Sequence, residues 1–233
     1  LCTLTSNERG FAPARAQPPL EDEDRRRYLN LLAAGGRQRD SSAALAALER
    51  ARALWEDDAY LHFLRGYHLE SLEDGDAART AYLRARDLDP RPWRATGAFN
   101  RVVRRVAAET GALLAEVDAS FVKHSPAAGV GWELMADHLH PTTAGQLLLA
   151  RAVVAALEDA PLPWGLAPAR RQQLQADDEY RRRLGDLPAE RLAVLRAMAA
   201  LFGAPPMDRG NEGRKSDLDR QAETLWERLS EGE

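Results

Sequence analysis

A repeat of thirty-four residues constrains the fold of this chain more than any other feature of its sequence. Two stretches of the segment 21–89 match each other at this offset. The identical positions are Asp40, Ala43, Ala44, Arg50, Ala51, Arg52 and Leu54 in the first stretch, and Asp74, Ala77, Ala78, Arg84, Ala85, Arg86 and Leu88 in the second. A period of this length with small residues at regular places is typical of stacked pairs of helices. We therefore expect residues 21–89 to be helical.

Small and large residues alternate in these repeats in a way that explains how such helices would pack. The small positions are Ala44, Ala51, Ala78 and Ala85, and the larger ones that would fill the gap between helices are Leu48 and Tyr82. With Gly66 and Pro90, these positions resemble the tetratricopeptide repeat family. The resemblance implies a helical scaffold that offers a surface to a protein partner. Two units are fewer than the roughly three that such repeats need to stand alone, so they should pack against another domain.

Composition excludes several classes of protein. The net charge of −4 is small and the basic residues are interleaved with acidic ones, which argues against nucleic acid as a partner. The single cysteine, Cys2, rules out a framework of intrachain disulfides. No apolar run reaches the roughly 18–20 residues that span a bilayer. The apolar stretch 147–157 is interrupted by Arg151, so we interpret it as a core helix and expect no membrane span.

Outside the repeats, the pattern alternates between short apolar stretches and helices. Residues 1–5 and 112–117 are predicted to be buried strands, and Gly111 is expected to end the helix before the second of them. The predicted helices span residues 96–109, 167–184, 188–202 and 218–229. Two parallel strands do not make a stable sheet by themselves, so the chain is expected to be a piece of a longer protein whose further strands precede Leu1. Residues 161–203 would then form carboxy-terminal helices and residues 204–233 a peripheral tail.

One short stretch, D-H-L-H-P-T-T-A-G at residues 137–145, carries the residue types that chemistry needs. A carboxylate three positions before a histidine can accept the Nδ1 proton of that ring, which leaves Nε2 available to take a proton from a serine. The residue before a proline is held extended, so His140 would stand at the start of the next helix. Thr142 or Thr143 could cap that helix, and its apolar face was expected to include Leu147, Ala150, Val154 and Leu157.

This stretch resembles the last conserved block of the SGNH/GDSL hydrolase family, Asp-x-x-His-Pro followed by a glycine. Asp137, His140, Pro141 and Gly145 fill those places. The resemblance extends over residues 1–15 and 90–160, with the repeats as an insertion. It implies an α/β fold, the flavodoxin-like three-layer fold of the family, here incomplete, within a chain that is mostly helical by residue count.

The resemblance also implies roles. His140 would be the general base and Asp137 the carboxylate that orients it, in hydrolysis of an acylated carbohydrate or lipid without a metal or another cofactor. The family's nucleophilic serine lies in a Gly-Asp-Ser-type motif, and no serine of this chain has such a context. We therefore expect this chain to supply half of a catalytic triad and to be inactive alone.

Several other interpretations of the same residues stay open. Asp137 and His140 could be an ordinary surface pair. Alternatively, His138 and His140 could bind a metal, with Asp137 or His124 as a further ligand. Ser125 is a fallback nucleophile, and a hydrolase fold retained only for carbohydrate binding is a further alternative. The main alternative is a repeat scaffold without enzymatic activity. The polar residues expected to lie in turns or on helix surfaces are Asn7, Arg9, Arg94, Asn100, His62 and His68.

Overall fold

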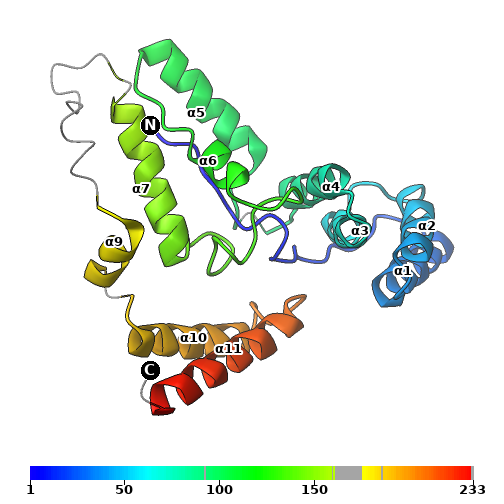
Figure 1. The fold of residues 1–233 in the computed structure, drawn as a ribbon. Helices are drawn as coiled ribbons and strands as arrows, with labels where there is room; N and C mark the ends of the chain where they lie inside the picture. Colours follow the sequence, from blue (N-terminus) through cyan, green and yellow to red (C-terminus); the bar gives the residue numbers. More distant parts are fainter. Residues whose placement is uncertain (92, 159, 161–174, 185, 232–233) are drawn as a thin grey trace. The chain divides into compact units, whose positions relative to one another are not determined.

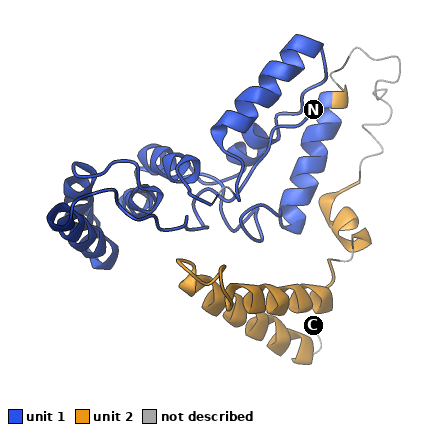
Figure 2. Ribbon diagram, turned by 180° about the vertical axis from the view of Figure 1, so that it is seen from behind, with its two compact units in different colours: residues 1–156 blue, residues 157–233 orange. Residues whose placement is uncertain are grey.

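The computed structural model of the protein describes residues 1–91, 93–158, 160, 175–184 and 186–231. These residues form ten α-helices and no β-strand, so the chain is mostly helical, as predicted. The chain divides into two compact units, Leu1–Ala156 and Leu157–Glu233 (Figures 1 and 2). No helix within the described ranges has the length and apolar character that a bilayer span requires.

The repeat segment forms four consecutive helices, α1 (Asp22–Arg37), α2 (Ser41–Arg52), α3 (Ala59–Ser71) and α4 (Gly75–Asp87). Each helix packs against the next one along the chain. Asp40 and Asp74, which correspond at the repeat offset, cap α2 and α4 by accepting backbone N–H groups of the first turn. A side-chain cap of this kind stabilises a helix start by ~1 kcal/mol, so the repeated aspartates fix where the second helix of each pair begins.

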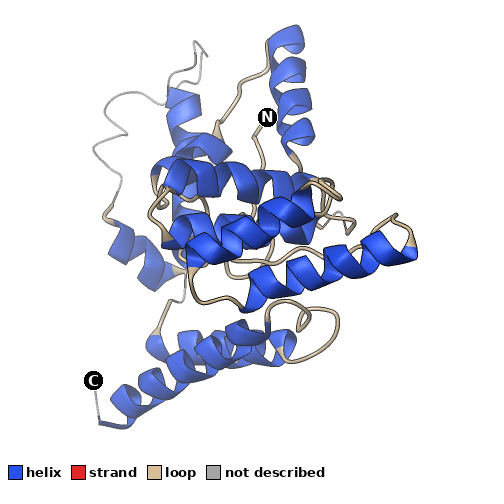
Figure 3. Cartoon of the chain, turned by 90° about the vertical axis from the view of Figure 1, so that its right-hand side faces the viewer, coloured by secondary structure: helices blue, strands red, loops and turns tan. Residues whose placement is uncertain are grey.

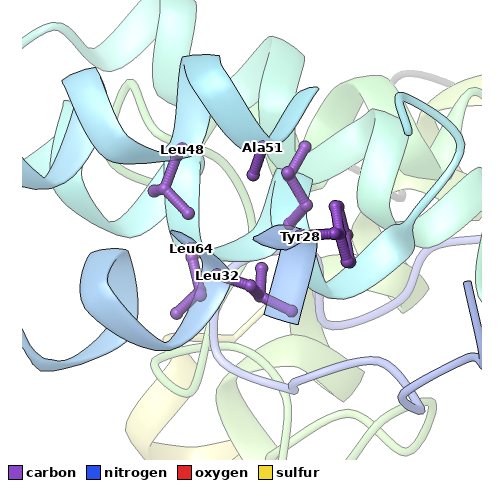
Figure 4. Packing of buried hydrophobic residues seen from close by; sticks show 6 residues of the cluster. Tyr28, Leu32, Leu48, Ala51 and Leu64 are labelled. Carbon is purple, nitrogen blue, oxygen red and sulfur yellow. The ribbon is translucent and has the colours of Figure 1, made fainter. Parts of the chain in front are cut away.

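Packing between the paired helices follows the predicted pattern of small and large residues. The side chain of Leu48 lies over Gly35 of α1, and that of Tyr82 lies over Gly66 of α3. A Cβ atom added to Gly66 would fall 2.6 Å from the Tyr82 ring, so no larger residue fits there. Figure 4 shows the first of these cores, in which Tyr28, Leu32, Leu48, Ala51 and Leu64 are buried together.

His62 and His68 are buried in α3, which corrects the prediction that they lie on the helix surface. His62 Nε2 lies 2.8 Å from the Glu56 carbonyl oxygen. His68 Nε2 lies 3.0 Å from the Gly35 carbonyl oxygen, and its Nδ1 lies 3.2 Å from Ser41 Oγ. Each imidazole therefore satisfies backbone groups of a neighbouring segment, which is what permits a polar ring to be buried.

Three more helices complete the first unit: α5 (Gly97–Thr110), α6 (Val117–Lys123) and α7 (Thr143–Glu158). α5 coincides with its predicted span to within one residue at each end. Gly111 follows it with φ of +68°, the left-handed conformation that glycine adopts at little cost at a helix end. The sequence therefore predicted both the helix and its stop.

The two predicted strands are reduced to an isolated parallel bridge between Cys2 and Ala115. Its hydrogen bonds run from Thr3 N to Ala115 O, at 3.0 Å, and from Ala115 N to Leu1 O, at 2.9 Å. The pairing does not continue toward the carboxyl ends of the two segments because α6 begins at Val117. The Asn100 side chain, and not a neighbouring strand, binds both backbone groups of Leu4, at 2.7 and 2.8 Å. The predicted extents of residues 1–5 and 112–117 as strands are therefore wrong for the described chain.

The second unit contains α9 (Asp177–Arg183), α10 (Pro188–Phe202) and α11 (Glu212–Glu231), which Figure 3 shows with the loops between them. α10 has its predicted bounds, and α11 begins six residues before the predicted Leu218. α10 and α11 pack against each other and bury Leu192, Phe202 and Leu218. Of the predicted helix 167–184, the stretch 167–174 lies outside the described residues.

Candidate functional site

A closed loop between Leu134 and Thr142 carries the two predicted site residues. Thr142 N donates to Leu134 O at 2.9 Å, and Ala136 N donates to His140 O at 2.8 Å, so the loop returns on itself. An antiparallel bridge pairs Met135 with Pro141, and the Met135 side chain is fully buried beneath the loop. The buried Met135 side chain and the hydrogen bonds across the loop hold the two site residues on one side of the turn.

Asp137 and His140 contact each other as predicted from their spacing. Asp137 Oδ2 lies 2.7 Å from His140 Nδ1, and Asp137 Oδ1 accepts the backbone N–H groups of Leu139 at 2.8 Å and His140 at 2.7 Å. Burial by itself would raise the pKa of Asp137, but these N–H donors and the imidazole outweigh it and hold the pKa below its ordinary value. Asp137 is therefore an ionised, buried carboxylate at neutral pH.

The other edge of the His140 ring faces outward. Its side chain is 69% exposed, and Nε2 has no hydrogen-bond partner within the described part of the chain. A neutral imidazole that donates its Nδ1 proton to a carboxylate carries a lone pair on Nε2. The arrangement can thus take a proton at Nε2 and stabilise the resulting imidazolium through Asp137.

Helix α7 holds this loop in place from its first turn. Thr142 caps the helix, with Oγ1 accepting the N–H of Gly145 at 3.2 Å. Gly145 lies directly on the loop, and a Cβ atom there would fall 2.3 Å from the Leu134 carbonyl oxygen. The apolar face of α7 that packs against Met135 and its neighbours comprises Ala144, Leu148, Ala152, Val153 and Ala156.

This face differs from the predicted one. Leu147 is buried, but Ala150 is exposed and Leu157 is 39% exposed. Most residues of α7 are apolar and lie all around the helix, so helical spacing alone does not distinguish the face that meets the core. The packing of the loop against the first turn of α7 determines which face of the helix is buried.

The segment 6–11 lies against the loop and supports it from the amino-terminal side. Asn7 N donates to His138 O at 3.1 Å, and Asn7 Nδ2 donates to Asp137 O at 3.3 Å. Beneath it, Arg94 donates from Nη1 to the carbonyl oxygens of Asn7 and Phe11, both at 3.0 Å, and from Nη2 to Asp89 at 2.9 Å. These hydrogen bonds connect the loop that carries Asp137 and His140, which we call the dyad, to the segment just before α5.

Arg94 and Asn100 are buried, which corrects their prediction as surface residues, and Asn7 lies buried in the loop where it was predicted, with its Oδ1 accepting the Gly10 N–H at 2.7 Å. Arg9 is half-buried and bridges Glu70 and Glu133, at 3.0 and 2.8 Å. Sequence alone does not indicate these roles, because most of the partners lie far away along the chain, as Glu70 does from Arg9, at 61 positions, and Asp137 from Asn7, at 130. A buried arginine such as Arg94 requires paired acceptors, and only the fold brings those acceptors together.

His138 lies inside the loop and supports it. Its ring packs against Phe11 and Trp93, with ring centroids 5.3 and 5.2 Å apart. Burial lowers the pKa of His138 and outweighs the opposing effect of Asp137. The ring is therefore a neutral part of an aromatic cluster beside the dyad.

The structure also places the residues of the alternative interpretations. The structure groups no three His, Cys, Asp or Glu side chains of the described chain around a possible metal position. His124 Nδ1 lies 2.8 Å from its own turn's carbonyl oxygen, at Ser120. Ser125 Oγ is buried and makes no hydrogen bond to a described residue. Trp132 packs over Gly10 and so covers the supporting segment.

Comparison of the chain with protein-family models, with curated proteins and with solved structures gives no match. The geometry of Asp137 and His140 and the motif that contains them are therefore the features of the chain that indicate a function.

Proposed function

We propose that Asp137 and His140 are the carboxylate and the general base of a serine ester hydrolase of the SGNH/GDSL type. The observation that carries the proposal is the 2.7 Å contact between Asp137 Oδ2 and His140 Nδ1, with Nε2 exposed and unpartnered in the described chain. An ordinary surface pair does not require a buried carboxylate that also accepts two backbone N–H groups.

We further propose that residues 1–15 and 90–160 belong to a flavodoxin-like α/β domain into which tetratricopeptide-like repeats are inserted. The parallel direction of the Cys2–Ala115 bridge supports this, because parallel pairing is the pattern of that fold. Helices lie against the bridge as well: Asn100 of α5 binds Leu4, and α7 packs on the cluster that contains Ala115. Helices on both sides of parallel strands are the arrangement that buries such strands.

The proposed reaction needs a hydroxyl nucleophile from a segment beyond the 233 residues. That oxygen would attack the acyl carbonyl carbon of the ester while His140 Nε2 accepts its proton. His140 would return the proton to the departing alcohol, and a water molecule activated in the same way would release the acid and regenerate the hydroxyl. Asp137 would stay ionised throughout and hold the ring. The substrate class proposed is an acylated carbohydrate or lipid.

Hydrolysis of p-nitrophenyl acetate by a protein that contains the complete domain tests the proposal. His140→Ala should lower kcat by about 10³-fold or more, and Asp137→Asn by a comparable factor. His124→Ala is the matched control, because His124 is an exposed histidine of the same unit and contacts neither dyad residue. Turnover that survives both dyad changes would refute the assigned roles.

The second candidate is a scaffold in which the repeats bind a protein partner. It is favoured by large apolar side chains that the repeats expose, Leu29 and Tyr67 among them. This function predicts that His140→Ala leaves the biological role intact and that Tyr67→Ser impairs it, so a complementation assay with the two variants separates the candidates.

A further inference from the structure

A pocket of about 240 Å³ lies on the repeats, between α1, α3 and the segment that precedes α1. Arg15, Tyr28, Leu29, Leu32, Arg37 and Tyr60 are among the residues that line it. None of these residues contributes to the Asp137–His140 site. The pocket therefore needs an explanation of its own.

Two guanidinium groups border the pocket without a carboxylate partner. Arg15 lies over the Tyr60 ring, 4.3 Å from its centroid, and donates to the Tyr60 hydroxyl at 3.1 Å. Arg37, at the end of α1, is exposed and forms no ion pair with any described residue. Most other arginines of the repeats do have such a partner, as Arg52, Arg65 and Arg84 show.

The carboxylate that lines the pocket, Asp58, is already occupied. The Tyr28 hydroxyl donates to its Oδ2, and Tyr60 N donates to its Oδ1 at 2.8 Å. Asp58 is buried, and neither Arg15 nor Arg37 forms an ion pair with it in the described structure. Two guanidinium groups and one buried carboxylate that forms no ion pair with either of them therefore line the pocket.

The remaining walls are apolar. Tyr28 and Leu32 form the inner side, and both belong to the buried cluster drawn in Figure 4, so this side is rigid. Leu29 stands beside them and is 44% exposed, so it offers apolar surface at the mouth of the pocket. Positive charge and apolar surface thus meet in one small cavity.

We propose that this pocket binds a small monocarboxylate with a short apolar tail. The carboxylate would accept hydrogen bonds from Arg15 and Arg37, because a guanidinium matches a carboxylate in both charge and geometry. The tail would lie against Leu29, Leu32 and Tyr28. The volume is below the roughly 300–1,000 Å³ of pockets for drug-sized ligands, which favours a free short-chain acid over a longer chain.

Isothermal titration of the 233-residue chain with acetate, butyrate, hexanoate and hexylamine tests this inference. Each added CH₂ group that is buried contributes about 0.8 kcal/mol, so hexanoate should bind about fifteenfold more tightly than butyrate. Hexylamine, with an equal tail and the opposite charge, should not bind. Absence of hexanoate binding, or equal binding of hexylamine, would overturn the proposal.

Variants then localise the binding. Arg37→Gln and Arg15→Gln should each weaken hexanoate binding about tenfold or more, as expected for the loss of a charge-assisted hydrogen bond. Arg27→Gln, on an exposed position of the same helix, is the matched control and should bind like the unchanged chain. Leu29→Glu places a negative charge at the pocket and should abolish binding, and circular dichroism verifies that each variant is folded. Binding that is unchanged in all three pocket variants would contradict the assignment.

A further titration distinguishes a free acid from the carboxyl terminus of a polypeptide as the ligand of the pocket. An acetylated tripeptide that ends in leucine presents the same carboxylate and apolar group. Weaker binding of this peptide than of hexanoate supports the free acid, whereas tighter binding would overturn it in favour of a peptide. Because none of these titrations measures ester hydrolysis, failure here leaves the proposed catalytic roles unaffected.

Discussion

The two carboxylate oxygens of Asp137 hold three donors at once: two backbone N–H groups and the imidazole of His140. The backbone hydrogen bonds to Oδ1 fix the orientation of the carboxylate relative to its own loop, so Oδ2 is held toward the His140 ring. His140 is then oriented by a group that does not itself move. Preorganisation of this kind is what distinguishes a base that is ready to act from a histidine that happens to be near an acid.

Replacement of Asp137 by asparagine should change the tautomer of His140. The amide of the asparagine can donate to Nδ1, and the ring would then carry its proton on Nε2, where a base must accept one. Nitrogen-15 NMR of the imidazole measures which nitrogen is protonated. The His124 ring serves as an internal control and should not change. An unaltered His140 tautomer in Asp137→Asn would show that the carboxylate does not set it.

Gly145→Ala should destabilise the first unit by ~1–3 kcal/mol, the usual effect of overpacking. The new Cβ would lie 2.3 Å from the Leu134 carbonyl oxygen and 2.8 Å from Pro141 Cβ, and a backbone carbonyl has little room to move. Urea unfolding followed by circular dichroism measures the loss. Gly213→Ala is the control, because nothing lies within 4 Å of its added Cβ. Equal stability of Gly145→Ala and the unchanged chain would contradict this packing.

At the scale of single elements, the repeats combine a predictable framework with buried polar groups that the repeat pattern does not reveal. The capping aspartates and the alanine positions recur at the repeat offset and occupy equivalent places. His62 and His68 do not recur, and each is held by a carbonyl of another segment. His68 therefore links α3 to α1 and to the start of α2, and His62 links α3 to the loop that precedes it.

The repeats should lose stability as the pH falls below about 6.5 because of His62. Burial lowers the pKa of His62 in the folded chain relative to its ordinary 6.5, although the Glu56 carbonyl opposes this. The unfolded chain then binds the proton more readily, so stability is present above pH 6.5 and falls as the pH drops toward the folded pKa. Urea unfolding of the chain and of His62→Gln between pH 8 and 5 should give free-energy curves that diverge in this window. Parallel curves would contradict the prediction.

At the scale of the whole molecule, the first unit joins the repeats to the dyad segment through charged residues. Glu8 is buried and lies 3.7 Å from Arg79 and 3.6 Å from Arg86, both on α4, while its Oε2 accepts the Val130 N–H at 3.2 Å. Arg9, next to it, bridges Glu70 of α3 and Glu133. The predicted division between residues 21–89 and the flanking segments is thus crossed by several ion pairs within one compact unit.

Glu8→Gln should alter the pH dependence of the first unit's stability. Burial raises the pKa of Glu8 above its ordinary 4.5 and outweighs the attraction of Arg79 and Arg86. A raised pKa means that the folded chain holds the proton more tightly, so this contribution to stability is full below pH 4.5 and is lost as the pH rises through the folded value. The unfolding free energy of the unchanged chain minus that of Glu8→Gln should therefore decrease from pH 4 to pH 7. Glu23→Gln, an exposed change on α1, should give a constant difference.

The sequence by itself determined the features that depend on local chemistry. The repeat offset aligns Asp40 with Asp74, which cap corresponding helices, Gly111 ends α5 as predicted, and the Asp137–His140 spacing predicted a carboxylate beside an imidazole. Each of these follows from groups within a few residues of one another, or from the pattern that repeats along the chain.

The tertiary structure alone decided which residues are buried across long separations. Asn100 binds both backbone groups of Leu4, Arg94 binds carbonyl oxygens more than eighty positions away, and the packing of the loop that carries Asp137 and His140 selects the buried face of α7. A nearly uniform apolar helix has no periodicity that fixes its orientation, and a buried polar side chain is stable only where the fold supplies partners. For these reasons the dyad could be predicted from sequence, while the segment that supports it could not.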